Sequence, residues 1–409
     1  MKTFLEKEVL SEQKNTHMTH LEDQVLYGGV NGTRQAINAL RELRNMLQGK
    51  TSGDISVKWD GAPAIFAGTD PSDGKFFVAK KGIFNKDPKV YKTKEDVDAD
   101  TSGDLNTKMN AALELLPSLG IKGVIQGDFL FGPGDLAKKK IDGTSYVTFH
   151  PNTIVYAVPT EQARDLLRAK IGIVWHTTYT GNAFENMKAS YGVNVKGLRS
   201  SSSVWSQDAM MTDAMDATMT PSETKVVDAH LKTAGALFRK VAGSTLRQLE
   251  QNQQLAQLIE QFNNTYVRKG EVIKDSRRHT AALQRWITQK FKAEKAKRSS
   301  LQGKKAQQEK LDNLMSFFDK RNTASLVAMF DLQKSIVEAK LILISKLNDL
   351  SNIDTFVKSR KGYQVTGQEG YVAIDALGGD AVKLVDRMEF SYNNFSPDIL
   401  KGWDKPSRN

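Results

Sequence analysis

The sequence predicts an α+β protein, and three features of its pattern support this prediction. Short β-favouring runs separated by Gly, Asp and Pro occupy the chain from Ile55 to about Pro159. A region almost free of β patterning then runs from Pro221 to about Leu350, where apolar residues recur at three- and four-residue spacing. The β-like pattern returns at Val365. We therefore expect a β-rich core interrupted by a large all-α insertion.

These changes of pattern divide the chain into four segments. We expect an N-terminal helical segment at residues 1–50, the first part of the core at 51–195, a helical basic insertion at 196–355 and the second part of the core at 356–409. The Ser-, Met- and Asp-rich start of the insertion is expected to be a linker. In the N-terminal segment, His17 and His20 lie three residues apart. We interpret them as packing or polar surface residues and not as metal ligands.

Composition excludes several classes of protein. No apolar run of the 409-residue chain approaches the roughly 20 residues that span a bilayer, and the N-terminus is too polar for a signal peptide. We therefore expect a cytoplasmic protein without a membrane partner. The chain has no cysteine, which excludes disulfides, cysteine nucleophiles and thiolate metal sites. Its six histidines lack the spacing of metal ligands, so any metal should be a hard ion on carboxylates, with Mg²⁺ the best candidate.

The net charge of +11 is concentrated in one segment. Between Arg268 and Lys310 there are 14 Lys and Arg but 4 Asp and Glu, a difference of 10, so the rest of the chain is close to neutral. Such a one-sided patch is typical of contact with nucleic-acid phosphates. The alternatives are a solvated helical face or docking onto an acidic protein. The candidate nucleic-acid-binding residues are Arg277, Arg278, Lys295 and Lys297.

The first β-like run centres on the sequence Lys58-Trp59-Asp60-Gly61. Apolar residues lie on both sides of it, and Gly61 with Pro63 predicts a tight turn between two strands. Lys58 would then end a strand beside that turn. A lysine held rigidly and partly buried there is disfavoured in its charged form, which leaves a nucleophilic amine. The alternative is a surface lysine in an ordinary hairpin.

The K-x-D-G sequence from Lys58 to Gly61 resembles motif I of the covalent nucleotidyltransferases, which include ATP-dependent DNA ligases, RNA ligases and mRNA-capping enzymes. In that superfamily the lysine attacks the α-phosphate of a nucleoside triphosphate, forms a lysine-NMP and releases pyrophosphate. The resemblance implies that Lys58 is the nucleophile and that Asp60 and Gly61 contribute to nucleotide binding. It also implies the nucleotidyltransferase (ligase adenylation domain) fold, with antiparallel sheets flanked by helices and the nucleotide between them.

Three later segments resemble further motifs of that superfamily. Lys80 and Lys81 stand where motif Ia commonly has arginine, which implies contact with phosphates of the nucleotide or of an acceptor strand. Asp128 resembles the acid of motif III, usually glutamate, and implies a contact with the ribose or a metal. Tyr156 or Phe149 lies where motif IIIa carries an aromatic ring that stacks on the purine; packing in a sheet is the alternative for both.

Glu369 and Lys383 resemble motifs IV and V. The resemblance implies that Glu369 is a ligand of Mg²⁺ and that Lys383 neutralises the α-phosphate as pyrophosphate leaves. Motif V usually has a second lysine two residues further on, where this chain has Val385. The intervening Gly378-Gly379-Asp380 predicts a hairpin turn that sets Glu369 and Lys383 on adjacent strands.

The combined motifs predict an ATP- and Mg²⁺-dependent polynucleotide ligase. Only 26 residues follow Lys383, fewer than the C-terminal OB-fold of DNA ligases and capping enzymes needs, so the resemblance favours an RNA-ligase-like, phage-type member. DNA remains open as a substrate. Two alternatives are a non-catalytic or degenerate nucleic-acid-binding protein and an adenylyltransferase that acts on a protein.

Overall fold

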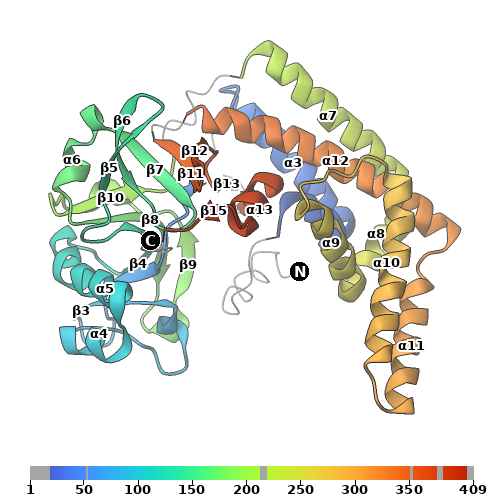
Figure 1. Cartoon of the computed structure of the whole chain (residues 1–409), viewed down its shortest axis with the longest axis horizontal. Helices are drawn as coiled ribbons and strands as arrows, with labels where there is room; N and C mark the ends of the chain where they lie inside the picture. The colour runs from blue at the N-terminus through green and yellow to red at the C-terminus, as the bar shows by residue number, and fades with distance from the viewer. Residues whose placement is uncertain (1–18, 52–53, 212–218, 351–352, 375–380, 403–409) are drawn as a thin grey trace.

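The computed structural model describes residues 19–51, 54–211, 219–350, 353–374 and 381–402. These residues form three β-sheets on one side and a helical unit on the other, which together make an arch (Figure 1). The prediction of an α+β protein is confirmed. The strands pair antiparallel, as expected, except for the parallel pair of β10 and β8. No helix in these described ranges is both long and apolar enough to span a membrane.

One sheet, here called the β4 sheet, has the strand order β10-β8-β4-β2-β3, and β9 pairs with β8. Its strands are β2 (Ala64–Thr69), β3 (Phe76–Ala79), β4 (Val124–Phe131), β8 (Ile171–Thr180), β9 (Lys188–Tyr191) and β10 (Val204–Asp208). The helix α5 (Gly103–Leu115) packs on one face through Met109 and Ala112, which share a core with Ile125 and Ile173.

The expected linker at the start of the insertion contains β10. Val204 is buried, and the Trp175 indole Nε1 donates a hydrogen bond to Ser206 Oγ at 2.7 Å. The first part of the core therefore extends to Asp208, beyond the boundary expected at residue 195. The five-residue strand is too short and too polar to produce a clear period in the sequence.

A second sheet, the β7 sheet, has the order β12-β11-β7-β6-β5, and β15 pairs with β11. Its strands are β5 (Ala137–Ile141), β6 (Thr144–Phe149), β7 (Ile154–Pro159), β11 (Asp354–Ser359), β12 (Gly362–Val365) and β15 (Ile399–Leu400). Phe149 and Tyr156 of this sheet share a hydrophobic core with Phe131 and Val174 of the β4 sheet. The two sheets therefore pack against each other.

The third sheet, the β1 sheet, has the order β1-β13-β14. Its strands are β1 (Asp54–Lys58), β13 (Gly370–Ile374) and β14 (Ala381–Leu384). The expected hairpin of β1 with the next strand is wrong, because β1 pairs with β13 while β2 pairs with β3 and β4. The other edge of β1 meets the segment after β10: Val57 N donates to Ala209 O, and Met211 N donates to Ile55 O, both at 2.7 Å. The chain thus passes from one sheet to another between Lys58 and Ala64.

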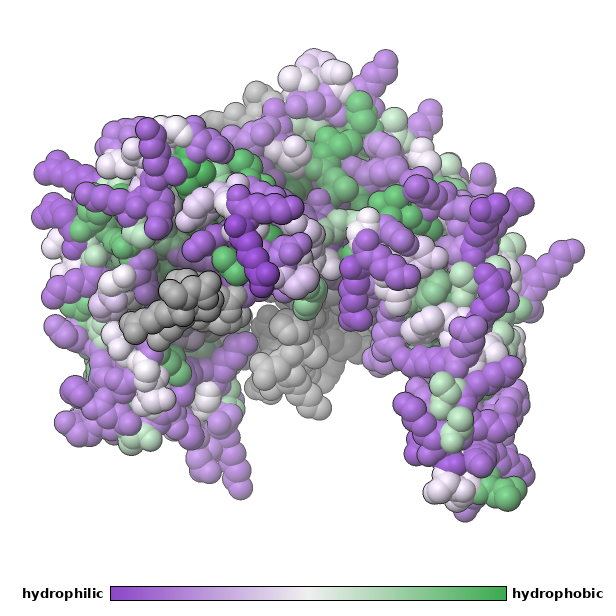
Figure 2. Space-filling model, in the orientation of Figure 1, coloured by the Kyte–Doolittle hydropathy of each residue, from purple (hydrophilic) through white to green (hydrophobic). Residues whose placement is uncertain are grey.

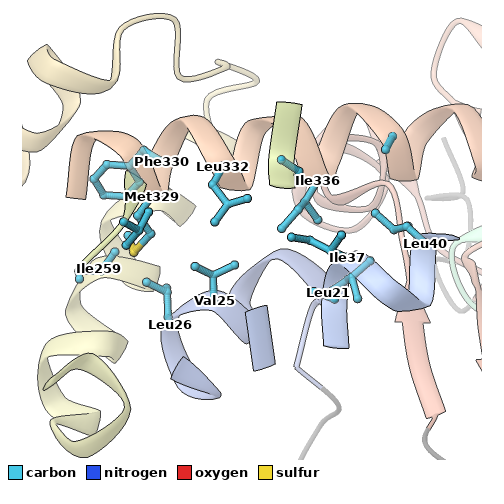
Figure 3. Close-up of a cluster of buried hydrophobic side chains, with 14 of the residues drawn as sticks. Leu21, Val25, Leu26, Ile37, Leu40, Ile259, Met329, Phe330, Leu332 and Ile336 are labelled. Carbon is cyan, nitrogen blue, oxygen red and sulfur yellow. The ribbon is translucent and has the colours of Figure 1, made fainter. Parts of the chain in front are cut away.

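The helical unit combines the N-terminal helices with those of the expected insertion. Its helices are α2 (Gln24–Tyr27), α3 (Gly29–Met46), α7 (Pro221–Lys240), α8 (Gly243–Gln251), α9 (Gln253–Val267), α10 (Ser276–Ala296), α11 (Leu301–Met315) and α12 (Lys320–Asn348). Figure 3 shows Val25, Ile37 and Ile336 in one buried cluster. The N-terminal helices are therefore not a separate segment. Ile55, Tyr371 and Leu384 of the β1 sheet belong to the same core, so the helical unit packs directly on this sheet.

Shorter helical elements complete the described chain. They are η1 (Leu21–Asp23), η2 (Lys81–Phe84), α4 (Lys94–Asp100), η3 (Leu116–Leu119), η4 (Thr160–Gln162), α6 (Arg164–Arg168), η5 (Phe184–Asn186), η6 (Val195–Gly197) and α13 (Arg387–Phe395). The helices α10 and α11 form a hairpin that projects from the helical unit, and its visible surface is largely hydrophilic (Figures 1 and 2).

Candidate functional site

Lys58 and Glu369 meet at one end of the β1 sheet. Lys58 is the last residue of β1, Glu369 immediately precedes β13, and the strand register pairs Lys58 with Gly370. The ammonium of Lys58 forms an ion pair with the carboxylate of Glu369. The Lys58 side chain is 38% exposed and that of Glu369 is 11% exposed. The amine is therefore accessible to a ligand, whereas the carboxylate is largely enclosed.

Lys383 lies on the same face of this sheet as Lys58. The register pairs Val372 of β13 with Lys383 of β14, two residues beyond the pair of Lys58 and Gly370. Residues two apart on a strand point to the same face, and directly paired residues share a face. The expectation that β13 and β14, which carry the segments resembling motifs IV and V, are adjacent is confirmed. The turn predicted at 378–380 lies outside the described residues.

Burial and mutual charge shape the electrostatics of this group. Burial raises the pKa of the Glu369 carboxyl, and the positive charges of Lys58 and Lys383 oppose that shift. Burial, together with the charge of Lys58, lowers the pKa of Lys383, although Glu369 acts in the other direction. An enclosed carboxyl in contact with an accessible amine is well placed to accept a proton from it.

Asp60 has a structural role in this arrangement. Its side chain is buried, and its carboxylate accepts hydrogen bonds from Asn152 Nδ2 at 2.6 Å, Thr153 N at 2.6 Å and Ile154 N at 2.8 Å. Protein donors thus occupy both oxygens. Burial raises the pKa of Asp60, while these hydrogen bonds act to lower it. Asp60 therefore ties the turn after Lys58 to the segment that enters β7, and each of its oxygens already accepts a hydrogen bond from the protein.

Gly61 allows this turn to lie directly on β4. A Cβ atom at Gly61 would be 2.6 Å from Asp128 Cβ and 2.9 Å from Phe129 O, closer than real Cβ contacts. The Ala62 N–H donates to the same Phe129 carbonyl at 2.8 Å. Asp128 is thereby brought beside the turn that follows Lys58.

Asp128 pairs with His176, a residue that the sequence did not single out. His176 Nε2 lies 3.5 Å from Asp128 Oδ2, and both side chains are partly exposed. A single histidine in an apolar strand carries no spacing signal, so only the pairing of β4 with β8 reveals it.

Tyr156 and Phe149 are both buried, which contradicts the expected purine contact. Tyr156 is 0% exposed, and its ring packs on Phe149 at 5.3 Å and on Trp59 at 4.8 Å between centroids. Its hydroxyl accepts a hydrogen bond from the Asp60 N–H at 2.7 Å. Neither ring leaves a face for a base, because the packing of the β7 sheet on the β4 sheet encloses both.

The two lysines that stand at the position of motif Ia have different environments. Lys80 forms an ion pair with Asp100 at 3.0 Å and lies over the ring of Tyr91 at 5.7 Å. Lys81 begins η2 and is exposed. Lys81 is therefore the better candidate for a phosphate contact.

A bound Mg²⁺ would need ligands besides the protein. Within the described part of the chain, no three His, Cys, Asp or Glu side chains are grouped closely enough to hold an ion. Mg²⁺ is commonly held by one or two carboxylates together with substrate phosphates. Glu369 fits that type of site, and Asp128 is the second carboxylate that we expected there.

A network of buried charges lies next to Lys383, and the sequence analysis did not predict it. His20 bridges to Lys383 through the backbone, and burial lowers the pKa of His20 to about 3. Arg387, four residues after Lys383, contacts Asp23 at 2.8 Å. Lys340 of α12 contacts Glu22 at 2.7 Å. The network fixes the end of β14 to the helical unit; its members come from distant segments, so no local pattern predicts it. His17 lies outside the described residues.

The four candidate nucleic-acid-binding residues do not form one patch. Arg277 and Arg278 lie at the start of α10, whereas Lys295 and Lys297 lie at its other end. At 1.5 Å rise per residue the two pairs are separated by about 25 Å. Lys295 Nζ also donates a hydrogen bond to Gln308 Oε1 at 2.9 Å.

Comparison with known families places the chain in one of them. The model of a family described as "Family of unknown function (DUF6267)" matches residues 15–398. The chain belongs to the DUF6267 family. The range matched by DUF6267 includes Lys58, Glu369, Lys383 and the whole helical unit. Neither a curated protein nor a solved structure matches the chain.

Proposed function

We propose that the chain is an ATP-dependent polynucleotide ligase, RNA-ligase-like with DNA open as a substrate, that works through a covalent AMP on Lys58. One observation carries the proposal. The accessible amine of Lys58 contacts the enclosed carboxylate of Glu369, and Lys383 lies on the same face of the β1 sheet. A nucleophile, a proton acceptor and a second cation are the groups that nucleotidyl transfer to lysine requires.

In the first step the uncharged Lys58 amine attacks the α-phosphorus of ATP. The N–P bond forms, the bond from the α-phosphorus to the oxygen that bridges to the β-phosphate breaks, and pyrophosphate leaves. Glu369, the acceptor in contact with the Lys58 ammonium, takes its first proton and so frees the amine, and the nitrogen gives its second proton to solvent as the N–P bond forms. Lys383 faces the developing negative charge on the phosphate. Mg²⁺, when bound with the nucleotide, supplies further positive charge to the phosphates.

In the next steps the AMP passes to the 5′-phosphate of a polynucleotide. The N–P bond breaks, and a new phosphoanhydride forms between AMP and the 5′-phosphate. A 3′-hydroxyl then attacks that activated phosphate, which seals the strand and releases AMP. Lys81 is the exposed cation next to the β4 sheet that suits a phosphate in these steps.

A degenerate nucleic-acid-binding protein is the second candidate, and one observation favours it. Val385 replaces the second lysine of motif V and is buried, so the group around Lys383 has one cation where the superfamily usually has two. The same chain would then bind a polynucleotide without modifying it.

One experiment tests the proposal against this alternative. The full chain is incubated with α-labelled ATP and Mg²⁺, freed of nucleotide and then mixed with a 5′-phosphorylated RNA or DNA oligonucleotide. The ligase proposal expects a protein-bound label that moves to the oligonucleotide. An absence of protein label with every divalent ion tried would support the binding protein.

A further inference from the structure

A groove of about 620 Å³ opens between the start of α10 and the start of α12. Arg277 and Lys320 line it, and no Asp or Glu is among its lining residues in the described chain. The sequence alone does not show this groove, because α10 and α12 begin more than forty residues apart along the chain. The groove is therefore a cationic concavity that only the fold creates.

The lining of this groove combines apolar, polar and cationic side chains. Phe318 and Val327 supply apolar surface, and Thr280 and Thr323 lie beside them. Gln284 Nε2 donates a hydrogen bond to Thr323 Oγ1 at 3.5 Å, which joins the two helices. A flat apolar group suits Phe318 and Val327, and an anion suits Arg277 and Lys320.

Two carboxylates that precede the helices of the groove are already engaged with the backbone. Asp275 caps α10 by accepting hydrogen bonds from Arg277 N and Arg278 N, and Asp319 caps α12 by accepting one from Asn322 N. They offset part of the positive charge but do not line the groove. Arg278 does not line it either: its side chain is 90% exposed and lies 3.5 Å from Asp275.

We infer that this groove binds one nucleotide of a single-stranded polynucleotide, with the phosphate between Arg277 and Lys320 and the base against Phe318 and Val327. The inference rests on the proposed function only in taking the same polynucleotide as its ligand. The inference adds Lys320 and the groove to the binding site for that ligand. It also gives Arg277, but not Arg278, a direct contact with it.

The charge of the neighbouring hairpin selects this occupant over an acidic peptide. Exposed cations continue along α10 and α11 to the far end of the hairpin: Lys292, Lys297, Arg298, Lys304, Lys305 and Lys310. Counted from Arg277, these cations are spread along about 30 Å of the hairpin at the rise of an α-helix. A polynucleotide carries one charge at every step along such a length, and apolar or aromatic side chains receive its bases.

The test measures binding of a labelled single-stranded RNA oligonucleotide to the full chain by fluorescence anisotropy over a series of salt concentrations. The variants are Arg277→Gln and Lys320→Gln, with Arg278→Gln as the matched control of equal charge next to the groove. Arg277→Lys keeps the charge. We expect Arg277→Gln and Lys320→Gln each to weaken binding roughly tenfold and to reduce the slope of log affinity against log salt by about 0.7. Arg278→Gln should change the affinity by less than about twofold, and Arg277→Lys should retain most of it.

Three results would overturn the inference. They are equal losses in Arg278→Gln and Arg277→Gln, unchanged affinity in both groove variants, and equally tight binding of a polyglutamate peptide that competes with the RNA. Thermal unfolding of each variant shows that the comparison is between folded proteins. Self-adenylation, measured on the same preparations, keeps the two proposals apart: its absence contradicts the chemistry at Lys58, whereas the groove stands or fails on the binding data.

Discussion

The ammonium of Lys58 and the carboxylate of Glu369 form an ion pair where β1 meets β13. The two residues come from opposite ends of the chain, and the pairing of these strands brings them together. Glu369 is enclosed and Lys58 is accessible, so a ligand can approach the pair from the side of the amine. The chemistry that we propose depends on that orientation.

Glu369→Gln removes the charge and keeps the shape of the side chain. We expect self-adenylation to fall by roughly 10²- to 10³-fold, because the amine loses its proton acceptor and Mg²⁺ loses a hard ligand. The measurement is the rate of protein labelling as a function of Mg²⁺ concentration. If the variant titrates with Mg²⁺ like the parent, Glu369 is structural, and Asp128→Asn becomes the variant to measure.

Asp60→Ala should destabilise the fold. The substitution leaves the buried donors Thr153 N and Ile154 N without their acceptor, at a cost of roughly 2–4 kcal/mol in the free energy of unfolding. Asp54→Ala, at the exposed start of β1, is the matched control and should change stability by less than about 0.5 kcal/mol. Urea unfolding of both variants measures the difference. Equal stability of the two variants would contradict the structural role of Asp60.

Val385→Lys tests whether the second lysine of motif V can be restored. Val385 is 1% exposed, and a Cβ atom placed on Gly370 would lie 2.5 Å from its Cγ2. We expect the variant to lose about 3 kcal/mol or more of stability, because it buries a charge without a partner. Thermal unfolding measures this loss. A variant of unchanged stability with faster self-adenylation would show that the site accepts the lysine.

The stability of the helical unit should depend on pH through His279. His279 is buried against Phe262 and Phe330, and burial lowers its pKa from 6.5 to about 4. Between these values the unfolded chain binds the proton more strongly than the folded one. The free energy of unfolding should therefore fall as the pH drops from about 6.5 towards 4, by at most about 1.4 kcal/mol per pH unit for this group.

His279→Gln removes the titrating ring and keeps an amide that can donate to Asn263. The variant should be less stable at neutral pH but should show a smaller pH dependence between 6.5 and 4. The control is Thr233→Ala at an exposed position of α7, which removes no titrating group and should leave the slope as in the parent. Denaturant unfolding at several pH values gives the three slopes, and equal slopes for parent and His279→Gln would exclude His279 as their source.

The sequence predicted the elements better than their partners. The division into β-rich and helical segments follows from hydrophobic period, which reports the face of each element that is buried. Period does not report what covers that face. The apolar stripe of α3 therefore gave a helix but not its shared core with α12, and the β-like run at Lys58 gave a strand but not its pairing with β13.

The candidate site shows the same division. The order of the motifs led us to expect β13 and β14 side by side, as the register has them. The burial of Tyr156 depends on the packing of two sheets, and the three donors to Asp60 come from a segment far along the chain. The distance between the cations at the two ends of α10 follows from the helix rise once the helix limits are known. That distance could therefore have been predicted from the sequence.

Labelling of Lys58 tests the central claim most directly. The full chain, Lys58→Ala and Lys58→Arg are incubated with α-labelled ATP and Mg²⁺, and the labelled peptide of the parent is mapped. We expect an acid-labile, alkali-stable label on Lys58 in the parent and none in either variant, because arginine keeps the charge but has no amine to deprotonate. Retained labelling in Lys58→Arg, or a label mapped to another residue, would contradict the account.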